Sequence, residues 1–173
     1  TIADTLCTAR KNIDIVTSEV DLAAAESELA SQTDRHDLLS RKLTPVVDKY
    51  DYILIDCPPS LGLLTINALA ASKELIVPMQ THFLALQGVS RLLETVSMLV
   101  GGMNPELQVS GIVLCMHEGH TNLGREVVAD LEEFFEASRD QDVPWRNCQI
   151  LQPPIRRNVK LAEAPSFGQT IFD

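Results

Sequence analysis

The sequence lacks any hydrophobic run long enough to cross a membrane. Its two longest uncharged stretches, Cys57 to Ser72 and Leu75 to Ser90, contain 16 residues each and include Pro, Asn, Gln and Thr. A spanning helix needs about 20 mostly apolar residues, so we expect none. The first residues, Thr1 to Asp4, also lack the basic and apolar regions of a signal peptide. These absences predict a cytoplasmic protein.

Cysteine is too sparse and too widely spaced to organise the fold. The four cysteines are separated by 50, 58 and 33 residues, at Cys7, Cys57, Cys115 and Cys148. This spacing matches neither a zinc pattern nor the disulfide framework of a small secreted domain. His117 and His120 are close in sequence but have no third ligand nearby, so we predict no metal site there.

Basic residues are few, with 14 Lys and Arg against 24 Asp and Glu, which gives a net charge of −10. The charge is distributed unevenly along the chain. Between Glu118 and Asp142 eight acids accompany two arginines, whereas between Val143 and Ala162 the only charges are Arg146, Arg156, Arg157 and Lys160. This basic stretch predicts a local surface that attracts phosphate. A solvated basic loop is the alternative.

Short apolar, β-branched runs alternate with helical patterns along the chain. The runs predict strands, and they are 13–16, 52–55, 75–77, 109–115 and 148–151. Apolar residues at helical spacing predict helices, and these are 38–50, 61–71, 92–100 and 127–135. Strands separated by helices form parallel sheets. We therefore predict an α/β fold with a doubly wound, mainly parallel sheet flanked by helices, in a single domain of residues 1–173.

The most informative segment runs from Tyr50 to Gly62. A predicted apolar strand would bring Asp56 to the carboxyl edge of the sheet, where open α/β sheets bind ligands. Pro58 and Pro59 would then turn the chain away from the sheet. A carboxylate in this place suits Mg²⁺, which is held by one or two carboxylates and by substrate phosphates. The alternative is that Asp56 caps the helix that begins near Leu61.

Two motifs resemble the ParA/Soj partitioning ATPases, a deviant-Walker group that also includes MinD. Residues 51–69, Asp-Tyr-Ile-Leu-Ile-Asp-Cys-Pro-Pro-Ser-Leu-Gly-Leu-Leu-Thr-Ile-Asn-Ala-Leu, resemble the Walker B and switch II region. Residues 157–168, Arg-Asn-Val-Lys-Leu-Ala-Glu-Ala-Pro-Ser-Phe-Gly, resemble the C-terminal signature. The resemblance covers nearly the whole chain. It implies the P-loop NTPase fold of the SIMIBI type and a function in chromosome or plasmid partitioning.

The resemblance also implies a nucleotide site. In the family's mechanism Asp56 would hold Mg²⁺ through a water molecule. The turn from Pro58 to Gly62, which we call the switch turn, would sense the γ-phosphate. Its catalytic candidates, together with Asp56, are Pro59, Ser60 and Gly62.

Adenine would rest against two further segments. The candidates there are Met116, Pro154 and Ile155, although this chain has Met-His-Glu and Ile-Arg-Arg where the family has Met-Tyr-Asp and Ile-Pro-Arg. For Pro153 and Pro154 the alternative is a rigid strand exit.

The sequence contains no Gly-Lys pair, which a P-loop requires because its backbone and lysine cradle the phosphates. The family places that loop upstream of the segments found here. We therefore expect an N-terminally incomplete chain that is inactive alone, with ATP and Mg²⁺ bound only by the full-length protein. A binding module without a P-loop is the competing hypothesis.

The resemblance implies partners as well. Arg157 and Lys160 match family positions that bind double-stranded DNA without sequence preference, and Arg156 adds a further charge. Family members form ATP-loaded homodimers and work with a ParB-like partner protein, so a nucleoid-associated location is expected. A MinD-like positioning ATPase would need a basic amphipathic C-terminal helix for membrane binding. Residues 168–173 do not supply one.

Overall fold

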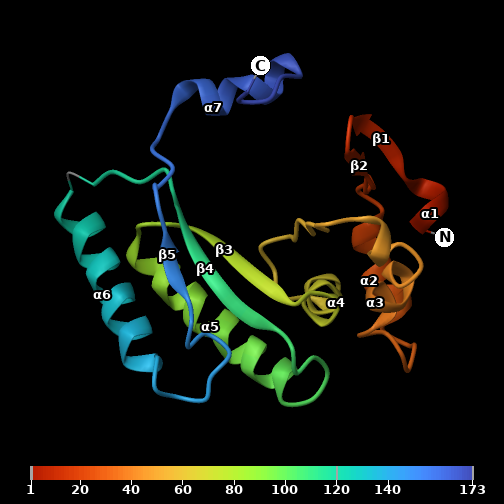
Figure 1. Ribbon diagram of the computed structural model, residues 1–173, viewed down its shortest axis with the longest axis horizontal. Coiled ribbons are helices and arrows are strands. Elements are labelled where there is room, and N and C mark those ends of the chain that lie inside the picture. The colour runs from red at the N-terminus through yellow and green to blue at the C-terminus, as the bar shows by residue number, and fades with distance from the viewer. Residues whose placement is uncertain (1, 120, 173) are drawn as a thin grey trace. The chain divides into compact units, whose positions relative to one another are not determined.

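The computed structural model describes residues 2–119 and 121–172. The chain divides into two compact units, the first formed by residues 1–73 and 101–105 and the second by residues 74–100 and 106–173 (Figure 1). Each is described by itself. Among the described residues no helix is both long and apolar enough to cross a membrane.

The second unit contains the predicted parallel sheet. Its strands are β3 (Glu74–Gln80), β4 (Gln108–Cys115) and β5 (Gln149–Leu151), and they pair in parallel in the order β3-β4-β5. Strand β4 is central and has the most buried residues of the three, as expected for a covered parallel strand. Pro78 lies in β3, an edge strand of this sheet, where a residue without an N–H group is tolerated.

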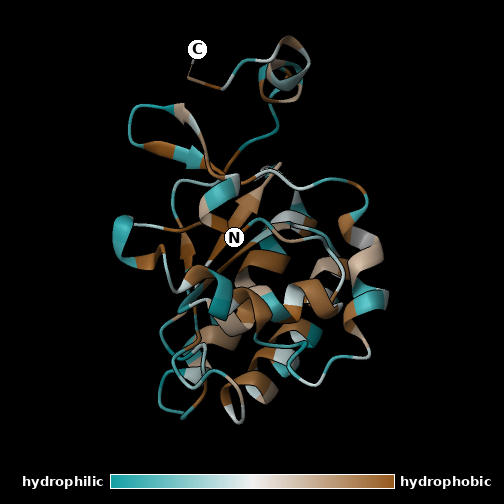
Figure 2. Ribbon diagram, turned by 90° about the vertical axis from the view of Figure 1, so that its right-hand side faces the viewer, coloured by the Kyte–Doolittle hydropathy of each residue, from teal (hydrophilic) through white to brown (hydrophobic). Residues whose placement is uncertain are grey.

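Two amphipathic helices accompany the sheet, α5 (Phe83–Val100) and α6 (Asn122–Ser138). They contact each other, and α6 also contacts β5. The predicted apolar stripe of α5 lies in the core, since Leu93, Val96 and Leu99 are almost fully buried. Figure 2 shows brown and teal alternating along the helical ribbons, as amphipathic helices require. The fold class predicted from the sequence is confirmed.

The first unit is mostly helical. It contains α1 (Ile2–Thr5), the hairpin β1 (Cys7–Arg10) and β2 (Ile13–Ile15), α2 (Leu22–Leu29), α3 (Leu38–Leu43), the 3₁₀ turn η1 (Val47–Lys49) and α4 (Leu63–Ala71). The helix predicted over 38–50 is therefore interrupted after Leu43. Pro45 explains the interruption, because it cannot donate the backbone hydrogen bond that a continuing helix needs.

Two strand predictions in this unit differ from the structure. The strand at 13–16 forms as β2, but it pairs antiparallel with β1 in a hairpin. The strand predicted at 52–55 is wrong, because this segment has no strand structure and Leu54 is 92% exposed. A strand exists only through hydrogen bonds to a neighbouring strand, and no described residue pairs with this segment.

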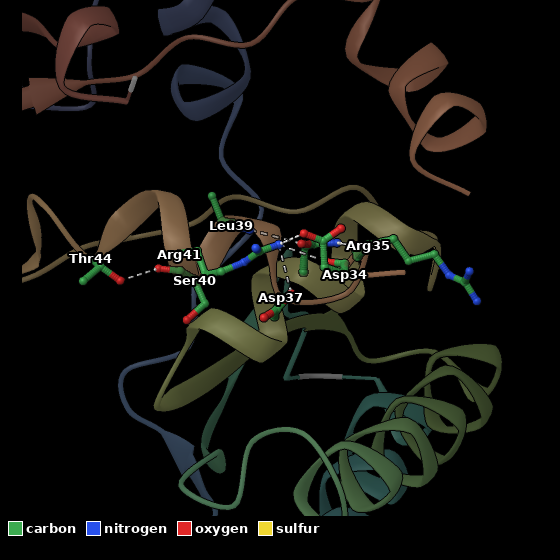
Figure 3. Close-up of polar contacts among 8 residues, drawn as sticks. Asp34, Arg35, Asp37, Leu39, Ser40, Arg41 and Thr44 are labelled. Carbon is green, nitrogen blue, oxygen red and sulfur yellow. Dashed lines mark hydrogen bonds and ion pairs between the residues drawn. The ribbon is translucent and has the colours of Figure 1, made fainter. Parts of the chain in front are cut away.

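The buried side-chain amide of Asn67 ties α4 to α3 and to the segment before it, through Leu39 and Arg35, which are labelled in Figure 3. The Asn67 side chain accepts a hydrogen bond from the Leu39 N–H at 3.2 Å and donates to the Arg35 carbonyl at 2.6 Å and the Leu63 carbonyl at 3.0 Å. Its oxygen and its amide nitrogen therefore both have partners, which offsets the cost of burying them. Nearby, Arg41 forms ion pairs with Asp34 and Asp37.

Candidate functional site

Asp56 is exposed and lies in a segment of the first unit without regular secondary structure. The sequence predicts that Asp56 follows a strand, and this is wrong because residues 52–55 pair with no other described residue. Asp56 does not cap the following helix either, because the N-cap of α4 is Gly62. The helix-cap interpretation of Asp56 is therefore wrong. The carboxylate remains accessible from solvent, as a ligand to a hydrated cation must be.

One side-chain hydrogen bond fastens the switch turn to α4, and a second joins the start of α4 to α2. The Thr65 hydroxyl donates to the Ser60 carbonyl at 2.6 Å, which folds the turn onto the first helical residues. The Leu64 N–H donates to Oε1 of Glu26 at 3.0 Å, so a carboxylate from α2 caps the helix. Pro59 and Ser60 are themselves exposed. The candidates Pro59, Ser60 and Gly62 thus belong to one turn with a defined conformation.

Cys57 is the next residue after Asp56 and is exposed. Its thiol pKa is raised, first by partial desolvation of the sulfur and second by the negative charge of Asp56. A raised pKa lowers the fraction of reactive thiolate near neutral pH. Burial similarly raises the pKa of Cys148 to about 11.

The second unit brings the three adenine-site candidates together at the carboxyl end of β4. Met116 follows β4 in a left-handed conformation with φ of 48°. The Ile155 N–H donates to the Leu114 carbonyl at 2.8 Å, and the His117 N–H donates to the Ile155 carbonyl at 3.0 Å. Pro154 precedes this contact, so both predicted segments lie side by side at one edge of the sheet.

The basic segment, which we define as Arg156, Arg157 and Lys160, is exposed throughout. Lys160 lies in the first turn of α7 (Val159–Glu163), which is capped by Asn158 and followed by η2 (Ala164–Phe167). Nε of Arg157 lies 3.6 Å from Oε1 of Glu118. The sequence suggested that no acid offsets the charge of this stretch, and that inference is wrong for Arg157. It is also wrong for Arg146, which pairs with Asp142 at 3.7 Å.

The described part of the chain contains no group of three His, Cys, Asp or Glu side chains that could hold a metal ion. A magnesium ion at Asp56 would therefore need its other ligands from water and from phosphate. His117 has a buried Nδ1 without a hydrogen-bond partner among the described residues. His120, the other histidine of that loop, lies outside the described residues.

The clearest hollow in the second unit lies elsewhere, between α6 and β5. It has a volume of about 620 Å³ and is lined mainly by polar residues, among them Glu132, Glu133 and Glu136. None of the predicted site residues line it.

Sequence reasoning missed two acidic residues, Glu26 and Glu118. Glu26 is 38 positions from its partner Leu64, and no local pattern signals so distant a cap. Glu118 becomes a neighbour of Arg157 because the backbone pairs residues 117 and 156 in an isolated bridge. The position of Glu118 in the loop after a predicted parallel strand was the one feature of the sequence that could have indicated a functional residue.

The chain is similar to partitioning proteins over most of its length. A family profile described as "AAA domain" matches residues 1–109. The chain is 42% identical over 165 residues to the sporulation initiation inhibitor protein Soj of Bacillus subtilis, which covers 95% of this chain and 61% of the relative. It is 40% identical over 160 residues to the chromosome-partitioning ATPase Soj of Treponema pallidum, with 92% and 59% coverage. The chain thus spans about 60% of the length of these relatives.

A solved structure is also similar to this chain. Cobyrinic acid a,c-diamide synthase from Mycobacterium smegmatis, determined with a bound ATP analog and magnesium, superimposes with a TM-score of 0.75 at 32% identity. The match covers 91% of this chain and 58% of that protein. The sheet and helices described above therefore have the arrangement found in a nucleotide-binding α/β protein.

Proposed function

The chain belongs to the AAA-domain family that contains the ParA and Soj proteins, and on that premise we propose that it works in a Mg²⁺-dependent partitioning ATPase. The observation that carries the proposal is a sequence match extending over 95% of the chain, including the segment around Asp56. Because the chain spans about 60% of its relatives, the activity is assigned to the full-length gene product. The DNA moved would be a chromosome or a plasmid.

The accessibility of the Asp56 carboxylate fits a site for Mg²⁺ and a nucleotide. Asp56 offers an exposed carboxylate that belongs to no group of three His, Cys, Asp or Glu side chains among the described residues, which suits an ion held mainly by water and phosphate. When bound, the ion would neutralise charge on the phosphates. Asp56 would orient a metal-bound water, and Pro59, Ser60 and Gly62 would hold the switch turn toward the γ-phosphate. Met116, Pro154 and Ile155 would form the surface against adenine.

The basic segment is proposed as a site for double-stranded DNA. Arg156, Arg157 and Lys160 are exposed and lie within five positions of one another on one loop and the helix that follows. Lysine and arginine contacts to phosphates supply most of the affinity in sequence-independent binding. An ATP-loaded homodimer would double this surface, and a ParB-like protein would be the regulatory partner. This function would place the protein on the nucleoid.

Nucleotide binding separates the proposed ATPase from a binding module of the same fold. Residues 1–173 contain no Gly-Lys pair, so this polypeptide alone is expected to bind ATP weakly or not at all. The full-length gene product is expected to bind ATP with Mg²⁺ and to hydrolyse it slowly. Isothermal calorimetry on both polypeptides measures the difference. Micromolar ATP binding by residues 1–173 would contradict this account of the phosphate site, and no hydrolysis by the full-length protein would contradict the proposed function.

The ion pair between Glu118 and Arg157 leads to a prediction about DNA affinity. Both side chains are largely exposed, so the pair is weak, but its carboxylate competes with DNA phosphate for the same guanidinium. Glu118→Gln is expected to raise duplex affinity by about threefold at low salt. Glu133→Gln makes the same change in net charge elsewhere on the second unit and serves as the control. Equal gains in both variants, measured by fluorescence anisotropy, would show that total charge alone is responsible.

A further inference from the structure

The N-terminus of α4 follows the switch turn directly and is capped from a distance. Gly62 is the N-cap and has no side chain that could accept a hydrogen bond from the first helical N–H groups. Glu26 supplies the missing acceptor, since its Oε1 lies 3.0 Å from the Leu64 nitrogen. A carboxylate is also the group that the positive end of a helix dipole favours.

The backbone is shaped to admit this carboxylate. A Cβ atom added to Gly62 would collide with Oε1 of Glu26 and would lie 3.1 Å from Oε2 and 3.2 Å from Cδ. The φ of Gly62 is −80°, a value open to any residue, so backbone strain is not the reason for glycine. The close approach of Glu26 is the reason that the structure offers.

We propose that Glu26 is a positioning residue for the switch turn. It holds the first turn of α4, and the bond from the Thr65 hydroxyl to the Ser60 carbonyl passes that constraint to the turn itself. Without Glu26 the helix start frays, and residues 60–62 lose the conformation in which they would meet the γ-phosphate. This inference rests on the proposed ATPase function, but the contact itself can be tested independently.

The test compares Glu26→Ala with Glu26→Gln, which keeps an acceptor oxygen but removes the charge. In the full-length gene product, Glu26→Ala is expected to lower the thermal midpoint by about 2–4 °C. It should also speed hydrogen exchange at the Leu64 amide by at least about tenfold, because that N–H loses its partner. Glu26→Gln should fall between the wild type and the alanine variant. Glu28→Ala, on the same helix α2, is the matched control and should change neither quantity.

Measurements of ATP hydrolysis distinguish a role of Glu26 in positioning the switch turn from a role in stability alone. Measured well below the thermal midpoint, kcat for ATP should fall about tenfold in Glu26→Ala while the ATP dissociation constant stays within about twofold. Partial recovery of kcat in Glu26→Gln is expected. If the wild type hydrolyses ATP and kcat is unchanged in Glu26→Ala, the positioning role is wrong, whereas the proposed ATPase function is not affected. A wild type without hydrolysis would overturn the proposed function and, with it, this role.

A double-mutant cycle that combines Glu26→Ala with Gly62→Ala tests the contact between Glu26 and the start of α4. Gly62→Ala should displace the Glu26 carboxylate and reproduce the faster exchange at Leu64. In a background of Glu26→Ala no carboxylate remains to be displaced, so adding Gly62→Ala should have a much smaller effect. Additive effects of the two substitutions on exchange would overturn the proposal, because they would show that Gly62 and Glu26 act independently.

Discussion

Replacing Asp56 with alanine in the full-length gene product is expected to reduce ATP hydrolysis at least about 100-fold, to background. The physical reason is that phosphoryl transfer depends on positioning and charge stabilisation, and the proposed function assigns the exposed carboxylate of Asp56 to orienting the metal-bound water. Phosphate release in a coupled assay measures the rate. Because Asp56 is exposed and forms no hydrogen bond or ion pair with the described residues, its loss should leave the thermal midpoint almost unchanged.

The matched control for this experiment is Asp48→Ala. Asp48 is an exposed acid in η1 of the same unit and has no place in the proposed site. It should retain the wild-type rate. Hydrolysis that survives Asp56→Ala would show that the metal is held by other residues, whereas equal loss in both variants would point to a general effect of acidic charge.

Replacing both Arg157 and Lys160 with alanine is expected to weaken binding to duplex DNA and to flatten its salt dependence. Each phosphate contact removed should lower the slope of log affinity against log salt by about 1, so the double variant should lose about 2. Two unrelated duplexes should lose affinity by similar factors, because phosphate contacts do not read sequence. Anisotropy across a salt series, with ATP and Mg²⁺ present, measures both quantities.

Arginine residues outside the basic segment provide the control. Arg139 and Arg146 are each paired with an acid, Glu136 at 2.8 Å and Asp142 at 3.7 Å. Their double alanine variant loses the same formal charge and should keep the wild-type slope. An unchanged slope in the Arg157 and Lys160 variant would assign the basic segment to another partner. A strong preference for one duplex would exclude recognition through the backbone alone.

The second unit could be predicted well from the sequence because its signals are local. The run from 109 to 115 is a buried strand, and the apolar spacing of α5 and α6 matches the faces they bury. The resemblance also named Met116 and Ile155, which the structure places on adjacent segments. In each case a short pattern determines the element, and the hydrophobic core determines how it packs.

The first unit was predicted less well because its structure depends on distant partners. Residues 52–55 have the composition of a strand, but a strand also needs a neighbour, which composition does not reveal. The cap from Glu26 to α4 connects positions 38 apart. In the second unit, the pair of Glu118 and Arg157 was missed for the same reason, because it depends on a bridge between two loops. Hydrogen bonds of this kind join segments that are far apart in the sequence, so the periodicity of hydrophobic residues within one segment does not predict them.

The exposure of two free cysteines bears on how association of this protein is measured. Cys7 and Cys57 are both exposed and unpaired by disulfides, whereas Cys148 is buried with a pKa of about 11. In air, exposed thiols of two copies can oxidise to an intermolecular disulfide, which would yield a covalent pair without any nucleotide. The elevated pKa of Cys57 slows this reaction near neutral pH but does not prevent it. Only the pairing that persists under reducing conditions, and disappears when ATP is withdrawn, reports the reversible assembly proposed for this family member.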